Sequence, residues 1–182
     1  MKNIVLFTLL LLGHISYGQN CQFEVNEVDK FTKQKRLQTK FEDYSNATFI
    51  SEKTGSKMKS VSVSLQRIDK KVRLLVKCKF AVDYSQFVYG NIDITLLLSN
   101  DSIIRLTGLY SEVIREYTNT TLIFELDQNS QILLKSTPVT DIRLVSTSPK
   151  TAIRPNESSD KIDFKPDVEK GILISKLIRC VE

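Results

Sequence analysis

The sequence predicts an α+β domain that is mainly antiparallel β-sheet, either a sandwich or a strongly curved sheet, with one C-terminal α-helix packed on it. Short segments that alternate apolar and polar residues predict the sheet, because half-buried strands have a period of two. The last segment repeats apolar residues at three- and four-residue intervals, which indicates an amphipathic helix. Residues 19–182 are expected to form a single domain, since no linker or repeat divides them.

Three antiparallel hairpins account for most of the predicted sheet. Each joins two apolar segments across a short polar turn. They comprise residues 61–65 with 72–82, residues 92–98 with 103–106, and residues 122–126 with 132–135. Other strands are predicted at Phe23 and Val25, over the basic residues 36–44, and over residues 141–146, after which a polar stretch continues through Asp160.

The C-terminal helix is predicted over about residues 166–180. Its apolar face comprises Val168, Ile172, Leu173, Leu177, Ile178 and Val181. Pro166 suits a first helical position, and Lys176 and Arg179 approach the negative end of the helix dipole. Gly171 should weaken the helix by about 1 kcal/mol relative to alanine. We expect this helix to cover one side of the sheet.

Residues 1–18 are predicted to be a secretory signal peptide. Lys2 precedes an apolar run over residues 4–12, and the small residues Ser16 and Gly18 would flank the cleavage site. The run is shorter than the roughly twenty apolar residues of a bilayer-spanning helix, so no transmembrane segment is expected after cleavage. The predicted location is therefore the periplasm, the cell surface or the medium.

Cleavage would remove His14, the only histidine of the chain. Mechanisms that need an imidazole base, acid or metal ligand would lose that residue. We therefore predict no catalytic residue and no cofactor. We also predict no metal site, because three dispersed cysteines without histidine do not have zinc-site spacing. Lipoprotein processing at Cys21 is the alternative to simple cleavage, although Asn20 occupies the position where that processing needs a small residue.

The three cysteines, Cys21, Cys78 and Cys180, allow three single pairings. An oxidising compartment favours a disulfide. Alternation places Cys78 on the same strand face as Val76 and Phe80, which indicates a small core residue. Cys21 and Cys180 lie near the two termini, which are often close together in a domain. We therefore predict a disulfide between Cys21 and Cys180.

Positive charge is concentrated in the first part of the mature chain. Residues 19–80 contain 14 basic and 7 acidic side chains, whereas residues 81–182 contain 11 basic and 14 acidic ones. The overall balance of +4 is too small to predict nucleic-acid binding. The basic side chains either solvate edge strands and turns or form a cationic face for an anionic glycan, lipid headgroup or acidic partner. They include Lys30, Lys33, Lys35, Arg36 and Lys40.

Few residues suggest chemistry. Paired carboxylates could hydrolyse a glycoside, and the candidates are Glu112, Glu116, Glu125 and Asp127. We expect these four to be exposed surface residues instead. Two serines are followed three residues later by lysine, at Ser56 and Ser158, and the triplet at residues 53–55 accompanies this motif in penicillin-binding proteins. In those proteins the serine opens a helix and the triplet comes much later on a strand, whereas here Ser56 and the triplet occupy one polar loop, so we expect the match to be a coincidence. The aromatic residues of segment 84–89 are more typical of a core cover than of a binding loop.

The mature chain resembles small exported proteins of unknown function from Gram-negative bacteria of the Bacteroidetes type. The similarity rests on Cys21 followed by residues 26–32, on residues 67–69 at a hairpin, on Gly90 before an apolar strand, on residues 141–144, and on a terminal helix that ends in cysteine. It implies a β-rich domain with a C-terminal helix and supplies no catalytic residues.

The function expected from the sequence is that of an exported, non-catalytic binding or structural module. Its partner is expected to be a glycan or protein of the cell envelope, and not a nucleic acid. A small carboxylate-dependent glycan hydrolase and a cationic binder of anionic glycan or lipid surfaces are the alternatives.

Overall fold

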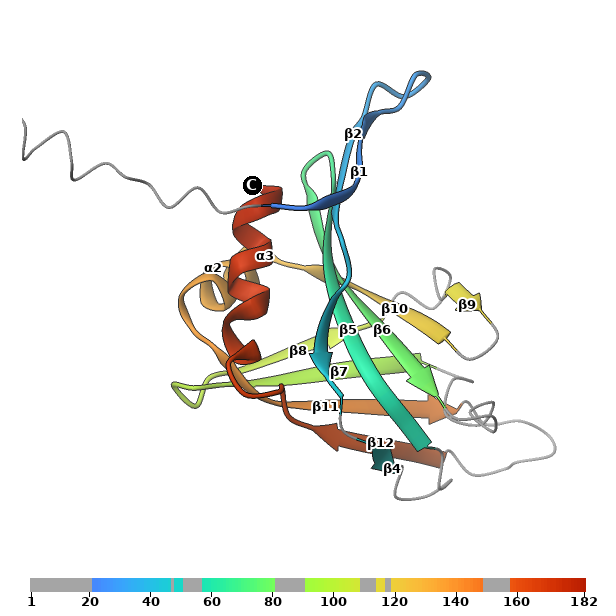
Figure 1. Cartoon of the computed structure of the whole chain (residues 1–182), viewed down its shortest axis with the longest axis vertical. Helices are drawn as coiled ribbons and strands as arrows, with labels where there is room; N and C mark the ends of the chain where they lie inside the picture. The colour runs from blue at the N-terminus through green and yellow to red at the C-terminus, as the bar shows by residue number, and fades with distance from the viewer. Residues whose placement is uncertain are drawn as a thin grey trace, which may run out of the picture.

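A computed structural model describes residues 21–46, 48–50, 57–80, 91–108, 114–116, 119–148 and 158–182. Within these ranges the chain forms two antiparallel sheets, two α-helices and a short 3₁₀ helix. The predicted class is therefore confirmed: the protein is mainly antiparallel β, with a C-terminal helix on the sheet (Figure 1).

The larger sheet, called sheet A, has β5 (Lys57–Ile68) and β6 (Lys71–Phe80) at its centre. Its main path is β1 (Phe23–Val28), β2 (Lys35–Thr39), β5, β6, β10 (Asn119–Leu126) and β9 (Ile114–Glu116). The short strands β3 (Glu42–Ser45) and β4 (Phe49–Ile50) also pair with β5. The smaller sheet, called sheet B, has the order β12 (Ser158–Phe164), β11 (Val139–Ser148), β7 (Asn91–Leu98) and β8 (Ile103–Thr107).

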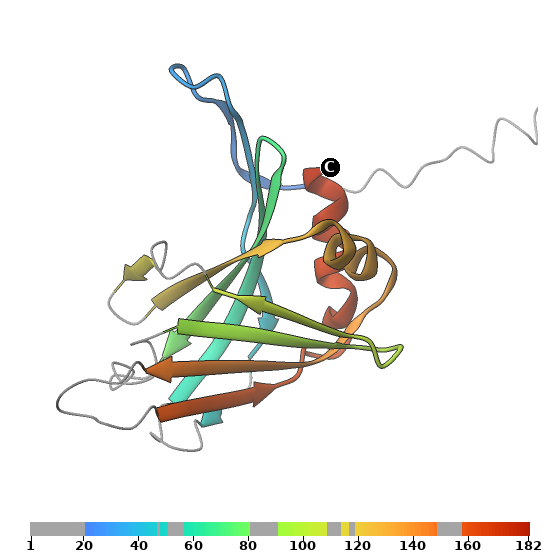
Figure 2. The same ribbon diagram turned by 180° about the vertical axis from the view of Figure 1, so that it is seen from behind.

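One face of sheet A is buried by two different elements. Sheet B covers part of it, and α3 (Leu173–Val181) lies beside sheet B against β5 and β2 (Figures 1 and 2). The same core cluster contains Leu65 of sheet A, Ile94 of sheet B and Ile178 of α3, each completely buried. The alternating apolar residues of the strands thus meet the helical apolar face in one continuous core.

The two sheets meet at both edges. On one edge, Gly108 follows β8 and forms an isolated bridge to Phe124 of β10, while its N–H donates to the carbonyl of Ile92 at 2.7 Å. On the other edge, the rings of Phe49 and Phe164 lie 5.2 Å apart between β4 and β12. These contacts give a sandwich, one of the two arrangements expected.

The first two predicted hairpins are confirmed. The strands β5 and β6 pair from Ile68 and Lys71 at the turn to Met58 and Phe80 at the far end. The strands β7 and β8 pair around the turn at residues 99–102. The predicted basic strand is divided into β2 and β3, both of which pair with β5.

The third predicted hairpin is wrong, because its second half is the helix α2 (Gln128–Ser136). The Asp127 carboxylate accepts a hydrogen bond from the Ser130 N–H at 2.7 Å and so caps the helix N-terminus. β10 instead pairs with β6, where Leu126 is opposite Val72. The sequence also failed to predict β12, since only Ile162 and Phe164 of that strand are buried apolar residues.

The C-terminal helix is shorter than predicted. A 3₁₀ turn, η3 (Lys170–Ile172), precedes α3, and residues 166–169 are not helical. Asp167 is bound to the end of β3 instead: its N–H donates to the Tyr44 carbonyl at 2.9 Å, and its carboxylate accepts from the Asn46 side chain at 2.9 Å. Glu169 has a φ of 71°, in the left-handed region, which is incompatible with a helical start there.

Gly171 has a packing role in place of the predicted helix-weakening one. A Cβ atom at this position would lie 2.7 Å from the backbone carbonyl oxygen of Val139 at the start of β11. Glycine therefore permits η3 to approach sheet B closely.

We predict that Gly171→Ala lowers the free energy of unfolding by about 1–3 kcal/mol, because the added methyl group overlaps a backbone atom that can move only with its strand. Urea denaturation followed by circular dichroism measures the effect. Lys170→Ala is the matched control and should change stability by less than about 0.5 kcal/mol. Equal midpoints for the two variants would contradict the packing role.

Candidate functional site

A disulfide joins Cys21, just before β1, to Cys180 in the last turn of α3, with a Cα–Cα distance of 5.6 Å. This is the pairing expected from the sequence. Cys78 is free and completely buried in the core, and this burial raises the pKa of its thiol to about 12. The disulfide is consistent with a protein located outside the cytoplasm.

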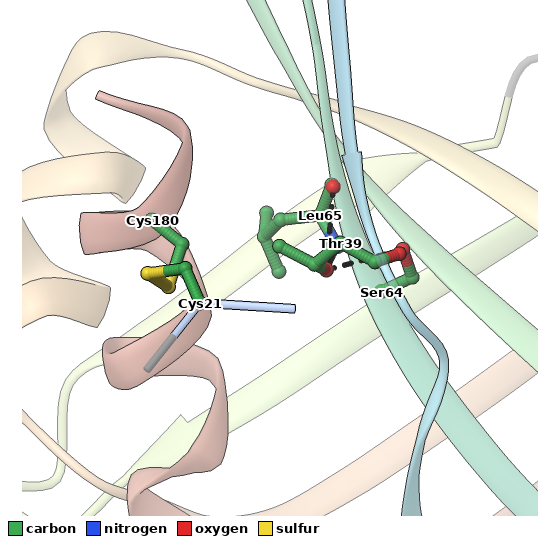
Figure 3. Close-up of a disulfide and its surroundings, with 5 residues drawn as sticks. All are labelled: Cys21, Thr39, Ser64, Leu65 and Cys180. Carbon is green, nitrogen blue, oxygen red and sulfur yellow. Dashed lines mark hydrogen bonds between the residues drawn. A yellow bond between two sulfur atoms is a disulfide. The ribbon is translucent and has the colours of Figure 1, made fainter. Parts of the chain in front are cut away.

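Buried polar groups beside the disulfide attach β2 to β5. Leu65 N–H donates to Thr39 Oγ1 at 3.0 Å, and Ser64 Oγ donates to the Thr39 carbonyl at 2.7 Å. Figure 3 shows Leu65 directed toward α3 and Ser64 directed away from it. Since Phe23 of β1 is paired with Thr39, these bonds and the disulfide together fix the base of the β1–β2 hairpin.

We predict that the double variant Cys21→Ala, Cys180→Ala loses about 3–5 kcal/mol of stability, because the disulfide closes a loop with a sequence separation of 159 residues. Chemical denaturation of the oxidised protein and the variant measures the difference.

The third thiol provides an internal check. Cys78 should resist iodoacetamide at pH 8 in the native protein and react only after unfolding, since thiolate is the reactive form and the pKa is about 12. A nonreducing peptide map that placed Cys78 in a crosslink would contradict the pairing.

The structure gives two of the four candidate carboxylates other roles. Glu125 is exposed on β10 and pairs with Lys71, with 3.2 Å between Oε2 and Nζ. Asp127 caps α2, and the hydrogen bond from the Ser130 N–H lowers the pKa of its carboxyl. Glu112 and the side chain of Glu116 lie outside the described residues. Every Asp or Glu side chain that the structure describes is at least partly exposed.

The capping role of Asp127 leads to a pH-dependent prediction. Asp127→Ala should cost about 1 kcal/mol at neutral pH, because it leaves an N-terminal N–H of α2 without its partner. The folded-state pKa is lowered below 3.8, so this stabilisation is present above that pH and is lost as the pH falls through the folded-state pKa.

The measurement is a series of urea midpoints from pH 7 to about pH 2. Asp127→Asn is the matched control, since its amide oxygen can cap the helix without titrating. If Asp127→Ala had the full stability of the parent at pH 7, the cap would have no energetic role.

The other sequence candidates contribute no constellation among the described residues. Ser56 and the aromatic segment 84–89 lie outside them, as does the side chain of Ser158. No cluster of three His, Cys, Asp or Glu side chains that could hold a metal ion occurs in the described ranges. No described helix has the length and apolar character needed to cross a bilayer.

Charged side chains on β11 and β12 of sheet B are paired with one another. A shallow hollow of about 460 Å³ lies over β7, β11 and β12. In it, Arg143 binds Asp163 through two hydrogen bonds of 2.7 Å, which lower the pKa of the Asp163 carboxyl. Lys165 lies 3.5 Å from Asp141. The four charged residues of this hollow therefore balance one another.

The β1–β2 hairpin presents a different surface. It continues past the β5–β6 turn and projects from the body of the molecule (Figure 1). We call this hairpin the arm and its end, residues 28–35, the arm tip. The last link between the tip and the rest of sheet A is the bond from the Asp69 N–H to the Lys35 carbonyl, at 3.1 Å.

Asp29 organises the turn of the arm tip. Its carboxylate accepts hydrogen bonds from the N–H groups of Phe31 at 2.9 Å and Thr32 at 2.7 Å. In the backbone, the Asp29 N–H donates to the Gln34 carbonyl and the Lys33 N–H donates to the Asp29 carbonyl, both at 2.9 Å. The bond from the Thr32 N–H is the main cause that lowers the pKa of Asp29. The carboxylate therefore stays ionised at neutral pH and is occupied by the turn.

The arm tip is both basic and apolar. Phe31 is 95% exposed and Val28 is 58% exposed. Lys30, Lys33 and Lys35 are exposed as well, and within the described part of the chain none of them forms an ion pair. Composition pointed to the three lysines but not to Phe31. An apolar residue between Asp29 and Thr32, in an otherwise polar turn, was the signal that could have identified it.

Comparison with known proteins gives no relative from which a function could be transferred. No family model matches the chain. Neither the curated proteins nor the solved structures contain a significant match.

Proposed function

We propose that the protein is an exported, non-catalytic binding module, and that the arm is its contact surface for an anionic partner in the cell envelope. The observation that carries the proposal is the arm tip, where hydrogen bonds to Asp29 close a turn that presents an exposed aromatic ring and three lysines with no ion pair to any described residue. Unsatisfied charge and exposed apolar area in one place are typical of interaction sites.

Charge balance supports an anionic partner. The arm tip carries three lysines against one carboxylate, and that carboxylate accepts hydrogen bonds from its own turn. Lys70, at the adjacent β5–β6 turn, is also exposed and outside any ion pair among the described residues. By contrast, Arg143 and Asp163 on sheet B neutralise each other.

The attachment of the arm supports a binding role as well. The disulfide and the buried bonds of Thr39 hold the base of the arm against α3 and β5. A surface held in place before binding loses less conformational entropy when the partner arrives. The predicted signal peptide and the disulfide together support a location outside the cytoplasm.

Heparin, as a soluble polyanion, tests the proposal. We expect the protein from Gln19 onward to be retained on a heparin column, with retention that falls steeply as salt increases. The variant Lys30→Glu, Lys33→Glu, Lys35→Glu should elute at a much lower salt concentration. Circular dichroism would establish that the variant is folded, as expected for exposed side chains that form no ion pair with any residue that the structure describes.

The matched control is Lys57→Glu, Lys59→Glu, Lys79→Glu. It makes the same change in net charge at exposed lysines toward the opposite end of β5 and β6. It should retain most of the affinity of the parent. Equal losses in both variants, or no salt-sensitive retention of the parent, would sink the proposal.

A further inference from the structure

Phe31 is unusual among the aromatic residues of this protein. It is 95% exposed, whereas every other aromatic side chain that the structure describes is buried or half-buried. Phe124 and Tyr44, by comparison, are completely buried. A large apolar side chain at the end of a projecting hairpin contributes nothing to the core. Together with Val28, which is 58% exposed, it gives the arm tip exposed apolar area that is available to a partner.

The turn holds Phe31 in this outward position. The Phe31 N–H is bound by the Asp29 carboxylate at 2.9 Å, and the Lys33 N–H is bound by the Asp29 carbonyl at 2.9 Å. Lys33 has a φ of 59°, a left-handed conformation that non-glycine residues seldom adopt outside well-defined turns. The ring is therefore presented by an organised turn, with lysines on either side of it in sequence.

The combination matches the chemistry of a lipid surface. In a bilayer, anionic phosphate groups lie just outside the hydrocarbon, and aromatic side chains partition into the boundary between them. A lysine stem can lie along apolar surface while its ammonium group reaches the phosphates. Each lysine near an anionic membrane increases affinity by about fivefold. A projecting tip can bring the ring to such a surface first.

We infer that the arm tip binds the surface of an anionic lipid bilayer, with Phe31 inserted at the boundary of the hydrocarbon and Lys30, Lys33 and Lys35 in contact with lipid phosphates. This inference rests on the proposed function and names its partner. A soluble anionic glycan would satisfy the lysines but would leave the ring of Phe31 without an apolar environment.

The test uses the absence of tryptophan from the chain. In Phe31→Trp, the protein from Gln19 onward has a single indole, at the tip. Vesicles of phosphatidylglycerol and phosphatidylcholine in equal parts should shift its emission to the blue, and brominated acyl chains should quench it. Vesicles of phosphatidylcholine alone should have little effect, and high salt should reverse the shift.

Val168→Trp is the matched control. Val168 is 92% exposed, but it precedes η3 and so lies beyond the N-terminal end of α3, whereas the arm leaves the body near the C-terminal end (Figure 1). The indole of this variant should remain unshifted and unquenched when the protein is bound to vesicles. Quenching in Val168→Trp but not in Phe31→Trp would overturn the inference, because another surface would then face the lipid.

A second variant separates insertion from charge. Phe31→Ser should weaken binding to the anionic vesicles by about tenfold or more, while its retention on heparin stays unchanged. Heparin retention without vesicle binding by the parent would overturn the lipid assignment and leave an anionic glycan as the partner class. If the parent bound neither heparin nor the anionic vesicles, both the proposed function and this inference would be wrong.

Discussion

One apolar face of sheet A must be removed from water, and this requirement positions the elements packed around it. Sheet B covers part of this face, and α3 buries the part that lies over β5 and β2. Leu65, Ile94 and Ile178 belong to three different elements but to one core. Removing water from this shared apolar surface is the main favourable contribution to such a fold. It also determines where α3 must lie, and hence where Cys180 lies.

The arm follows from that arrangement. Because α3 ends beside the first residues of β1, Cys180 can bond to Cys21, and the base of the β1–β2 hairpin is held against the body. From Lys35 toward its tip, the hairpin is not paired with β5 or any other described strand of sheet A. Its tip must then be organised by its own residues, and Asp29 supplies the required acceptors. The same local order presents Phe31 to the outside.

Local sequence patterns predicted the structure best where strands that are adjacent in the chain pair with one another. The alternation around Val63 and Val76 was sufficient to predict the β5–β6 hairpin and the burial of Cys78, because a two-residue period and a short turn are local properties. It failed at residues 132–135, where a short apolar run is compatible with strand or helix. There the cap at Asp127 and the contacts of α2 with α3 decided the outcome; one of these is the 2.6 Å bond from Ser175 Oγ to the Lys135 carbonyl.

Periodicity and composition were enough to predict the class of fold, most of the strands, a C-terminal helix and the basic character of residues 30–40. They did not predict the start of that helix, the need for glycine at Gly171, or which described basic residues form ion pairs, because these depend on contacts across the fold. Asp167 is drawn to β3, the backbone at Gly171 meets Val139, and Arg143 finds Asp163 on the adjacent strand. Each is a contact between segments distant in the chain or in different strands, and local pattern carries no information about such distances.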